Sequence, residues 1–249
     1  MGDDLLSGIE DVSGIAMELL VREQVADALA VAQRRIEHAE RMRYRFAVLD
    51  SAPGRSIEHV RAVRAGLTSA YAALYYPWVR VKDPDNRREL SLPPSGFVAG
   101  IYARVGPARG AGRPPANEAV TLAIGLDQNV TKASLTALNG ECINCIRAFG
   151  PRDFRLWGGR TLSEDPEWKY VNLRRYFIFL ERSIDKGTQW AVFEPNGEPL
   201  LRHEAIGSQA LVGEHLVGGD THHRAVVPGD TGRRPSRPRD TSTWPRHAD

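Results

Sequence analysis

The feature that most constrains the fold is an alternation of amphipathic helical segments with short apolar runs, which continues from residue 21 to residue 195. In the segment 21–43, apolar residues recur at helical spacing and charged side chains cover the opposite face, as in a helix that packs on a core. The apolar run 44–50 follows directly and predicts a short buried strand. Because helical and strand patterns alternate in this way, we predict an α/β fold in which a mixed sheet is flanked by helices.

The other elements are predicted from apolar periodicity and from capping and turn residues. Further helices are expected over 57–67 with Ser56 as N-cap, over 97–105, from Thr131 to Leu138, and over 170–187 with Gly187 as the stop signal. Further strands are expected over 71–81, 142–149, 154–162 and 188–195. Residues 82–90 are expected to form a polar loop, and the glycines and prolines of 106–118 exclude regular structure there.

The sequence divides into three parts: an N-terminal remnant over 1–20, an α/β core over 21–201 and an atypical tail over 202–249. The tail has no sustained helical or strand period and is rich in Gly, Pro, Arg and His. Such a composition does not bury enough apolar surface to offset the loss of chain entropy on folding. We therefore expect the tail to be disordered from about residue 218 onward.

Charge and composition exclude several classes of function. A net charge of +2 gives no global field for nucleic acid or an anionic membrane. No apolar run approaches the roughly 20 residues that span a bilayer, and the acidic N-terminus is unlike a signal peptide. Two cysteines form no disulfide framework in a chain of 249 residues. We therefore expect synthesis in a reducing, intracellular compartment, and neither nucleic acid nor membrane as a partner.

Two motifs suggest redox or metal chemistry, but a simpler interpretation is favoured for each. Cys142 and Cys145 form a CxxC motif inside a strand-like run, where alternation points the two thiols to opposite faces. Without a second CxxC, they are expected to be ordinary core or surface cysteines. The tail histidines lack metal-binding spacing, and His38 and His59 are expected on solvated helix faces. No metal or other cofactor is predicted.

Two further clusters are also weak candidates for a chemical site. Gly106, Gly110 and Gly112 lead into prolines rather than into a helix N-terminus that could hold a phosphate. The densest acidic cluster, Glu164, Asp165 and Glu167, could supply acid/base carboxylates if it lay in a cleft. Because these residues flank Pro166 in a predicted turn, a solvated turn or a contact surface is favoured. No catalytic residue is predicted.

Bulky aromatic side chains gather near predicted strand ends and turns, beside Pro, Arg and Asn. The group consists of Tyr75, Tyr76, Trp78, Trp157, Trp168, Trp190 and Phe193. Aromatic residues and arginine are enriched at protein–protein interfaces, although each position could equally lie at the edge of a core. As a group they favour binding over catalysis.

Several longer motifs carry a family resemblance. They are "SAYAALYYPWVRVKDP" (69–84), "LPPSGFVAGIYARV" (92–105), "PPANE" (114–118), "INCIRAF" (143–149), "LWGGRTLSEDPEWKYVNLRR" (156–175) and "GTQWAVFEPN" (187–196). In this order they resemble successive motifs of the contractile tail sheath proteins of phages and of phage-tail-like injection systems. The resemblance runs nearly continuously from about Val12 to Leu200.

The resemblance implies a tail-sheath-like middle domain and a structural, non-enzymatic role. Sheath subunits stack as hexameric rings around an inner tube and hold an extended, metastable lattice. A trigger at the baseplate lets the lattice shorten and widen, which drives the tube through a target envelope. The implied partners are other sheath subunits, the inner tube protein and the baseplate. The implied place of synthesis is the bacterial cytoplasm, before assembly into a phage tail or tail-like particle.

The resemblance also indicates which positions serve structure or assembly. They are Tyr75, Tyr76, Pro77, Trp78, Pro93, Pro94, Ser95, Gly96, Asn117, Glu118, Asn144, Arg147, Trp157, Gly158, Arg160, Trp168, Asn172, Arg174, Arg175, Trp190, Phe193, Glu194 and Pro195.

The two ends depart from the family pattern. The family connects neighbouring subunits through donated extended arms that add strands to adjacent chains, one before this region and one in a C-terminal domain. The sequence is expected to begin after the first arm, and residues after Leu201 do not resemble the C-terminal domain. The tail resembles a shifted reading frame or a replaced end. We therefore expect a truncated or decayed sheath paralogue that need not assemble by itself.

Two alternatives remain beside the sheath subunit. One is an α/β enzyme, such as a hydrolase that uses the acidic cluster near Asp165. The other is an inert fragment, or a dominant-negative interactor of a full-length sheath. The sequence does not distinguish a phage from a tailocin or an injection system.

Overall fold

The computed structural model describes residues 14–17, 25–110 and 112–193, together with residues 195, 197, 198 and 202. The predicted disordered tail and most of the predicted N-terminal remnant lie outside these residues. The helices are α2 (Val25–Met42), α3 (Ile57–Ala65), α4 (Pro94–Arg109), α5 (Lys132–Gly140) and α6 (Val171–Thr188), with short 3-10 helices η1 (Pro166–Trp168) and η2 (Gln189–Phe193). The strands are β1 (Gly14–Met17), β2 (Arg45–Asp50), β3 (Ala72–Tyr76), β4 (Val79–Lys82), β5 (Glu89–Leu92), β6 (Glu118–Ala119), β7 (Ala123–Leu126), β8 (Ile143–Gly150) and β9 (Asp153–Trp157).

The main sheet is mixed and has six strands in the order β1-β2-β3-β8-β9-β6. The first four strands are parallel to one another, whereas β9 is antiparallel to β8 and β6 is antiparallel to β9. A second, antiparallel sheet has the order β5-β4-β7. The predicted fold class, a mixed sheet flanked by helices, is therefore confirmed.

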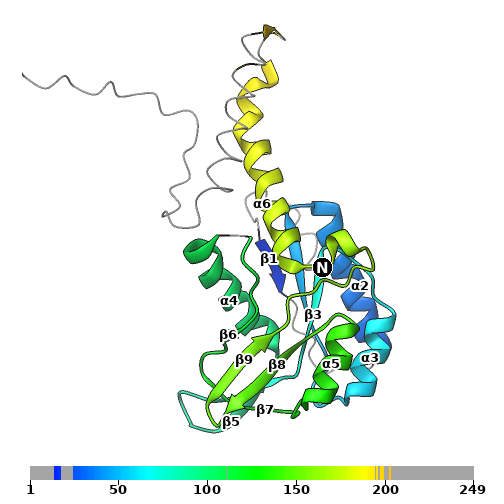
Figure 1. Cartoon of the computed structure of the whole chain (residues 1–249), viewed down its shortest axis with the longest axis vertical. Coiled ribbons are helices and arrows are strands. Elements are labelled where there is room, and N and C mark those ends of the chain that lie inside the picture. Colours follow the sequence, from blue (N-terminus) through cyan, green and yellow to red (C-terminus); the bar gives the residue numbers. More distant parts are fainter. Residues whose placement is uncertain are drawn as a thin grey trace, which may run out of the picture.

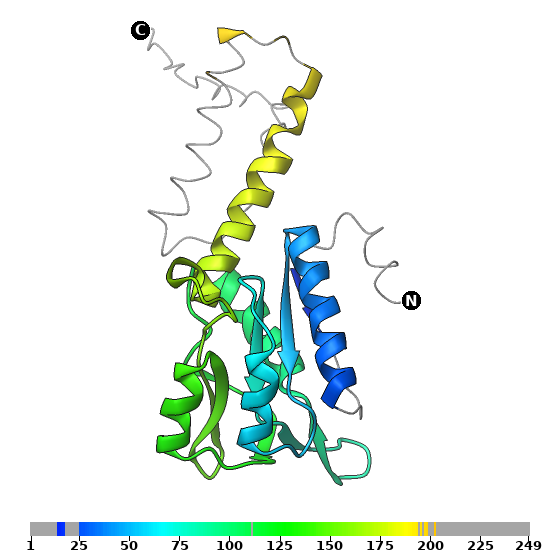
Figure 2. The ribbon, with the colours of Figure 1, turned by 90° about the vertical axis from the view of Figure 1, so that its right-hand side faces the viewer.

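Both faces of the main sheet are buried against helices. Helices α2, α3 and α5 cover one face, and α4 covers the other (Figures 1 and 2). Alternate residues of one strand enter different cores: Leu74 packs on the side of α2, α3 and α5, whereas Tyr75 packs on the side of α4. Burial on both faces explains why β2 and β3 are apolar along almost their whole length.

Both predicted N-caps are confirmed. Ser56 precedes α3 and its Oγ accepts a hydrogen bond from the amide of His59 at 3.4 Å. Thr131 precedes α5 and its Oγ1 accepts from the amide of Ser134 at 3.2 Å. Each hydroxyl satisfies one of the amides that a helix leaves unpaired in its first turn.

The single strand predicted over 71–81 is wrong, because β3 and β4 are separate strands in different sheets. Pro77, which is buried, lies between them. Proline lacks the amide hydrogen that a central strand needs for its ladder. The chain therefore leaves the main sheet at Tyr76, and Val79 begins the second sheet.

The segment after β4 is more regular than predicted. Residues 82–90 are not all loop, since β5 begins at Glu89 and pairs antiparallel with β4. The helix predicted over 97–105 is longer at both ends and includes Pro94 at its first position, where a missing amide costs nothing. It also continues through Gly106 to Arg109, so the expectation that 106–118 holds no regular structure is wrong.

The last predicted helix and strand have different outcomes. The helix over 170–187 is confirmed as α6, which begins at Val171 and ends at Thr188, one residue after Gly187. Its second half extends beyond the main sheet (Figure 2). The strand predicted over 188–195 is wrong, because η2 occupies Gln189–Phe193 as a 3-10 helix.

Candidate interaction surface

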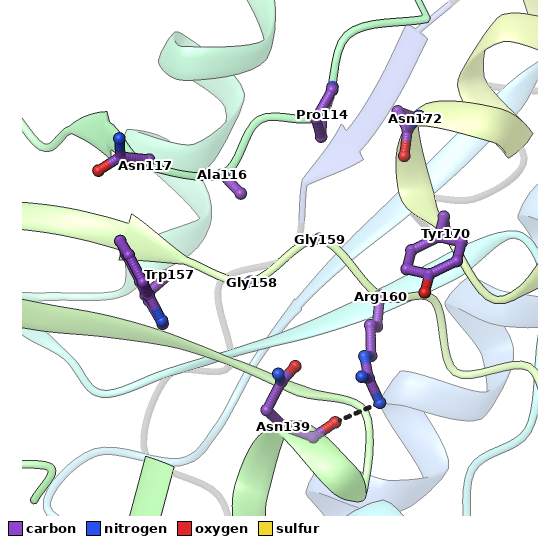
Figure 3. A pocket seen from close by; sticks show the side chains of 10 residues that line it. All are labelled: Pro114, Ala116, Asn117, Asn139, Trp157, Gly158, Gly159, Arg160, Tyr170 and Asn172. Carbon is purple, nitrogen blue, oxygen red and sulfur yellow. Dashed lines mark hydrogen bonds between the residues drawn. The ribbon is translucent and has the colours of Figure 1, made fainter. Parts of the chain in front are cut away.

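Residues from several separate sequence motifs meet around one open depression of about 310 Å³. Asn117, Trp157, Gly158, Arg160 and Asn172, all of which are family-motif positions, line it. Figure 3 shows Trp157 and Tyr170 on two sides, with the backbone of Gly158 and Gly159 crossing between them. The depression lies after the end of β9, where this strand leaves the sheet. These positions belong to motifs that are separate in the sequence, which does not reveal that they lie together.

Asn144 holds the segment that forms the floor of the depression. It is fully buried in β8, and its Oδ1 accepts a hydrogen bond from the amide of Arg160 at 2.7 Å. Its Nδ2 donates to the carbonyl of Arg160 at 2.7 Å and to the carbonyl of Leu74 at 3.3 Å. One amide side chain thereby links β3, β8 and the loop after β9. Its role is to position this loop.

The rim is fixed by further hydrogen bonds to backbone groups. The guanidinium of Arg160 donates to the carbonyl of Asn139 at 2.9 Å, as Figure 3 shows. Asn172 donates from Nδ2 to the carbonyl of Gly112 at 3.0 Å. Asn117 has a φ of 63°, a left-handed conformation that asparagine tolerates better than most residues, and its amide donates to the carbonyl of Leu156 at 2.7 Å.

Glu118, next to Asn117, connects this rim to α4. Its carboxylate accepts hydrogen bonds from Arg104 at 3.3 Å and from Arg109 at 3.1 Å. Both arginines lie on α4 and are exposed, so the pairs add little stability individually. They connect the start of β6 to the second half of α4.

Two aromatic side chains on this surface are accessible. Trp157 is 37% exposed and Tyr170 is 49% exposed. Trp157 packs on Phe149, with ring centroids 4.9 Å apart, and Phe149 is also exposed. The guanidinium carbon of Arg147 lies 4.9 Å from the centroid of the Phe149 ring. The depression therefore continues onto an aromatic and cationic face of the β8–β9 hairpin.

Other family-motif positions are buried and serve the core. Tyr75 and Tyr102 share a hydroxyl–hydroxyl hydrogen bond between β3 and α4, and burial raises the pKa of Tyr102 to about 12. Tyr76 donates to the carbonyl of Arg55 at 3.2 Å. Trp78 donates from its indole to the carbonyl of Ser51 at 2.7 Å. These contacts connect β3 and the start of β4 to neighbouring elements.

The start of α4 is held against the end of β2. The amide of Ser95 donates to Oδ1 of Asp50 at 2.7 Å, and both residues are buried. A carboxylate at a helix N-terminus is stabilised by the unpaired amides there. Pro93 and Pro94 are buried beside this contact, whereas Gly96 is exposed.

Two consecutive arginines anchor α6. The guanidinium carbon of Arg174 lies 3.6 Å from the centroid of the Trp168 ring and 4.3 Å from that of Tyr71. That of Arg175 lies 4.3 Å from the centroid of the Tyr102 ring. Burial lowers the pKa of both guanidinium groups. Stacking on aromatic faces compensates part of the cost of burying these cations.

The aromatic group proposed from sequence therefore has two different roles. Tyr75, Tyr76 and Trp78 are core residues, so for these three the alternative of a core position, which the sequence left open, holds. Trp157, Trp190 and Phe193 are exposed, with Phe193 at 97%, and Trp168 is half-buried. Pro195 is exposed, and Glu194 lies outside the described residues. The assembly role of the exposed positions stays a prediction.

The CxxC motif is part of the core. Cys142 and Cys145 are both free and buried. Burial raises the pKa of the Cys145 thiol to about 12, whereas a reactive cysteine needs a lowered pKa. Among the described residues, no group of three His, Cys, Asp or Glu side chains has an arrangement suited to a metal ion.

His38 corrects a sequence prediction. It was expected on a solvated helix face, yet it is 2% exposed. Arg45, which is also buried, donates a hydrogen bond to its Nε2. His59 is half-buried rather than fully solvated. The partner of His38 lies on the next element, where periodicity does not reveal it.

The acidic cluster lies in an exposed turn, and the first glycine of the run 106–112 is part of a helix. Glu164, Asp165 and Glu167 are exposed in the turn that contains η1, and Asp165 caps that turn by accepting from the amide of Glu167 at 2.9 Å. Gly106 lies inside α4 rather than in a loop before a helix.

Within the described ranges, no helix has the length and apolarity needed to cross a membrane.

Comparison with known proteins places these features in a family context. The sequence profile of the phage tail sheath protein central domain matches residues 3–162. A prophage major tail sheath protein of Pseudomonas aeruginosa (strain UCBPP-PA14) is 29% identical over 161 residues, which are 62% of the chain and 40% of that relative.

The fold of the chain is similar to that of sheath proteins in solved structures. The helical sheath of the anti-feeding prophage in its contracted state is 31% identical, with a TM-score of 0.65 over 86% of the chain and 56% of the sheath chain. The PVC sheath complex of an extracellular contractile injection system, also in its contracted state, is 28% identical. Its TM-score is 0.69, and the match covers 89% of the chain and 60% of the PVC sheath chain. The chain thus spans roughly half the length of these relatives.

Proposed function

The chain belongs to the phage tail sheath protein family, and we propose that it is a structural subunit of a contractile sheath. In this role it surrounds an inner tube and packs against other sheath subunits. The observation that carries the proposal is the shared fold with sheath chains of two contractile systems over more than four fifths of this chain. The proposed partners are other sheath subunits, the tube protein and the baseplate.

Contraction requires a subunit that stays intact while its contacts change. Tightly packed cores do not deform continuously, and large transitions are carried by rigid bodies that exchange one interface for another. The hydrogen bonds of Asn144 and the stacking of Arg174 tie loops and α6 to the sheet. We infer that the described core moves as one body during contraction, driven by the free-energy difference between two packings of the lattice.

A non-enzymatic role is part of the proposal. The family is structural, and the acidic turn that could support hydrolysis is exposed on the surface. Acid/base catalysis needs a site that shifts carboxyl pKa values. The charge-neutral variant E164Q/D165N/E167Q tests this point, because it removes the carboxylates that a hydrolase at this turn would need. Hydrolytic activity in the purified chain that this variant abolishes would instead favour the enzyme.

The proposal is tested by co-assembly. The chain is expressed together with the sheath and tube proteins of its own particle, and the particles are imaged by electron microscopy. Incorporation along the tube is expected. Its exclusion from particles that otherwise form normally would favour an inert fragment. The same particles would be made in the bacterial cytoplasm.

A further inference from the structure

The exposed face of the β8–β9 hairpin carries an unusual set of side chains, which we call the hairpin patch: Arg147, Phe149, Arg152, Arg155 and Trp157. Arg147 and Arg155 lie directly opposite each other on the two strands. Like charges in this position destabilise a strand pair. Asp153 pairs with Arg155 at 2.8 Å. Within the described part of the chain, however, no carboxylate pairs with Arg147 or Arg152.

The aromatic residues of the hairpin patch make it suited to a protein partner. The rings of Phe149 and Trp157 pack on each other in a tilted arrangement, and both side chains are exposed. The guanidinium carbons of Arg147 and Arg155 lie 4.9 and 5.9 Å from the centroid of the Phe149 ring. Exposed aromatic rings with adjacent arginines are the composition typical of interface centres. The excess positive charge selects a partner segment that is acidic.

The same chain presents such a segment. The acidic turn, defined as Glu164, Asp165 and Glu167, is exposed, and among the described residues no cation forms an ion pair with it. Trp168 follows it directly and is half-buried. These carboxylates complement Arg147 and Arg152, the two arginines of the hairpin patch that pair with no carboxylate in the described part of the chain.

The arginines of the hairpin patch and the acidic turn lie toward opposite ends of the sheet. The amide of Leu162, just before the acidic turn, donates to the carbonyl of Ala72 at the beginning of β3. Tyr76 at the end of β3 pairs with Cys145, and the parallel strand β8 continues beyond that point to Gly150. The hairpin can be followed in Figure 1. One molecule therefore cannot bring its own acidic turn onto the arginines of its hairpin patch.

We propose that the hairpin patch of one molecule binds the acidic turn of a second copy of this chain. The contact is head-to-tail, and contacts of this kind generate closed rings or open helical arrays rather than isolated twofold dimers. The inference deepens the proposed sheath function, because it names a pair of surfaces through which neighbouring subunits meet. In this contact, Arg147 and Trp157 of one copy bind the acidic turn of the next copy.

Charge exchange tests this contact. The hairpin variant R147E/R152E and the turn variant E164K/E167K should each associate at least about tenfold more weakly than the unmodified chain at low ionic strength, measured by sedimentation. Mixing the two variants should restore association, because each then offers the opposite charge to the other. The control variants R34E/R88E and E37K change the net charge in the same directions on exposed positions elsewhere, and they should associate normally.

Site-specific cross-linking supplies a second measurement. A photoreactive phenylalanine analogue in place of Trp157 should form intermolecular links to residues 161–169 of another copy. Circular dichroism of each variant verifies that it is folded. If R147E/R152E does not fold, the single variant R152E replaces it in the charge-exchange test. A chain that neither associates nor cross-links at low ionic strength would overturn the proposal, and so would association that the charge variants leave unaltered or that mixing does not restore.

The outcome is separable from that of the proposed function. Charge variants that enter sheath particles as well as the unmodified chain would refute this contact and leave the sheath role intact. If the unmodified chain is excluded from particles but the charge-exchange pair behaves as expected, the contact stands and the sheath role fails.

Discussion

The side chain of Asn144 occupies the space that a side chain on Gly158 would need. A Cβ on Gly158 would lie 2.7 Å from Oδ1 of Asn144 and 2.9 Å from its Cα. Both distances are shorter than contacts that carbon atoms make in proteins, so the backbone after β9 passes β8 at a separation that only glycine permits. Gly158 and Asn144 therefore explain each other's identity: one allows the approach and the other forms the hydrogen bonds that hold it.

Replacing Gly158 with alanine should lower the free energy of unfolding by about 1–3 kcal/mol, because the added methyl group forces a tightly packed backbone to move. Gly159→Ala is the matched control, since its Cβ would meet only Pro115 at an ordinary 3.6 Å. Denaturant unfolding of both variants measures the difference. Equal stability of the two variants would refute the close-approach explanation.

Replacing Asn144 with alanine should cost about 1–3 kcal/mol through the unsatisfied amide of Arg160 alone. Loss of the hydrogen bonds between the Asn144 side chain and Arg160 should also free the loop after β9. The amide of Arg160 should therefore exchange its hydrogen faster in the variant. Asn129→Ala is the control, because that asparagine is exposed before α5. Unaltered exchange at Arg160 would show that the Asn144 side chain does not position the loop.

Arg174→Lys should lower the free energy of unfolding by about 1–2 kcal/mol even though it keeps the charge. Lysine has no planar group to stack between Trp168 and Tyr71, and ammonium is harder to desolvate than guanidinium. The hydrogen bond from Arg174 to the hydroxyl of Tyr71, 3.2 Å long, is lost as well. Arg113→Lys, at an exposed position, should have no measurable effect. Thermal unfolding of the two variants measures the difference, and an Arg174→Lys chain as stable as the Arg113→Lys chain would contradict the stacking role of Arg174.

Burial of Cys145 predicts both its reactivity and a dependence of stability on pH. With its pKa raised from 9.0 to about 12, the folded chain keeps this thiol protonated where the unfolded chain ionises it. The folded state thus binds more protons between pH 9 and 12, so this contribution to stability is complete below pH 9 and is lost as the pH rises. A thiol reagent at pH 8 should label Cys145 only after denaturation. Rapid labelling of the native chain would contradict its burial.

Local chemistry made much of the fold predictable. Ser56 and Thr131 were identified as caps because their hydroxyls have a single favourable role before an apolar periodic segment. Residues 44–50 were identified as a buried strand because the run is short, apolar and bounded by turn residues. In these cases the residues that decide the structure lie within a few positions of one another.

The errors arose where tertiary contacts outweigh local preference. Gly106 disfavours a helix interior by about 1 kcal/mol, yet α4 continues past it because Tyr102 and Val105 are buried against the sheet. Residues 188–195 are rich in strand-forming side chains, but η2 is part of neither of the two sheets in the described part of the chain. Propensity alone does not show which segments find a partner.

The candidate surface was predictable as residues but not as an arrangement. The motifs that contain Asn117, Asn144 and Arg160 are separated by loops and by α5, and only the pairing of β8 with β9 and of β9 with β6 brings them together. The exposed Trp157 and the buried Trp78 look alike in sequence, since both follow an apolar run. What separates them is whether an element covers the strand end, which is a property of the whole topology.

The most direct test of the sheath role is the composition and structure of native particles. The chain carrying an affinity tag is expressed in the organism from which it comes, tubular particles are purified, and their sheath is examined by mass spectrometry and cryo-electron microscopy. We predict that the tagged chain is present along the tube and that the six-stranded sheet with α2, α3, α4 and α5 fits the sheath density. Particles that contain other sheath subunits while the tagged chain remains entirely in the unassembled fraction would contradict the account.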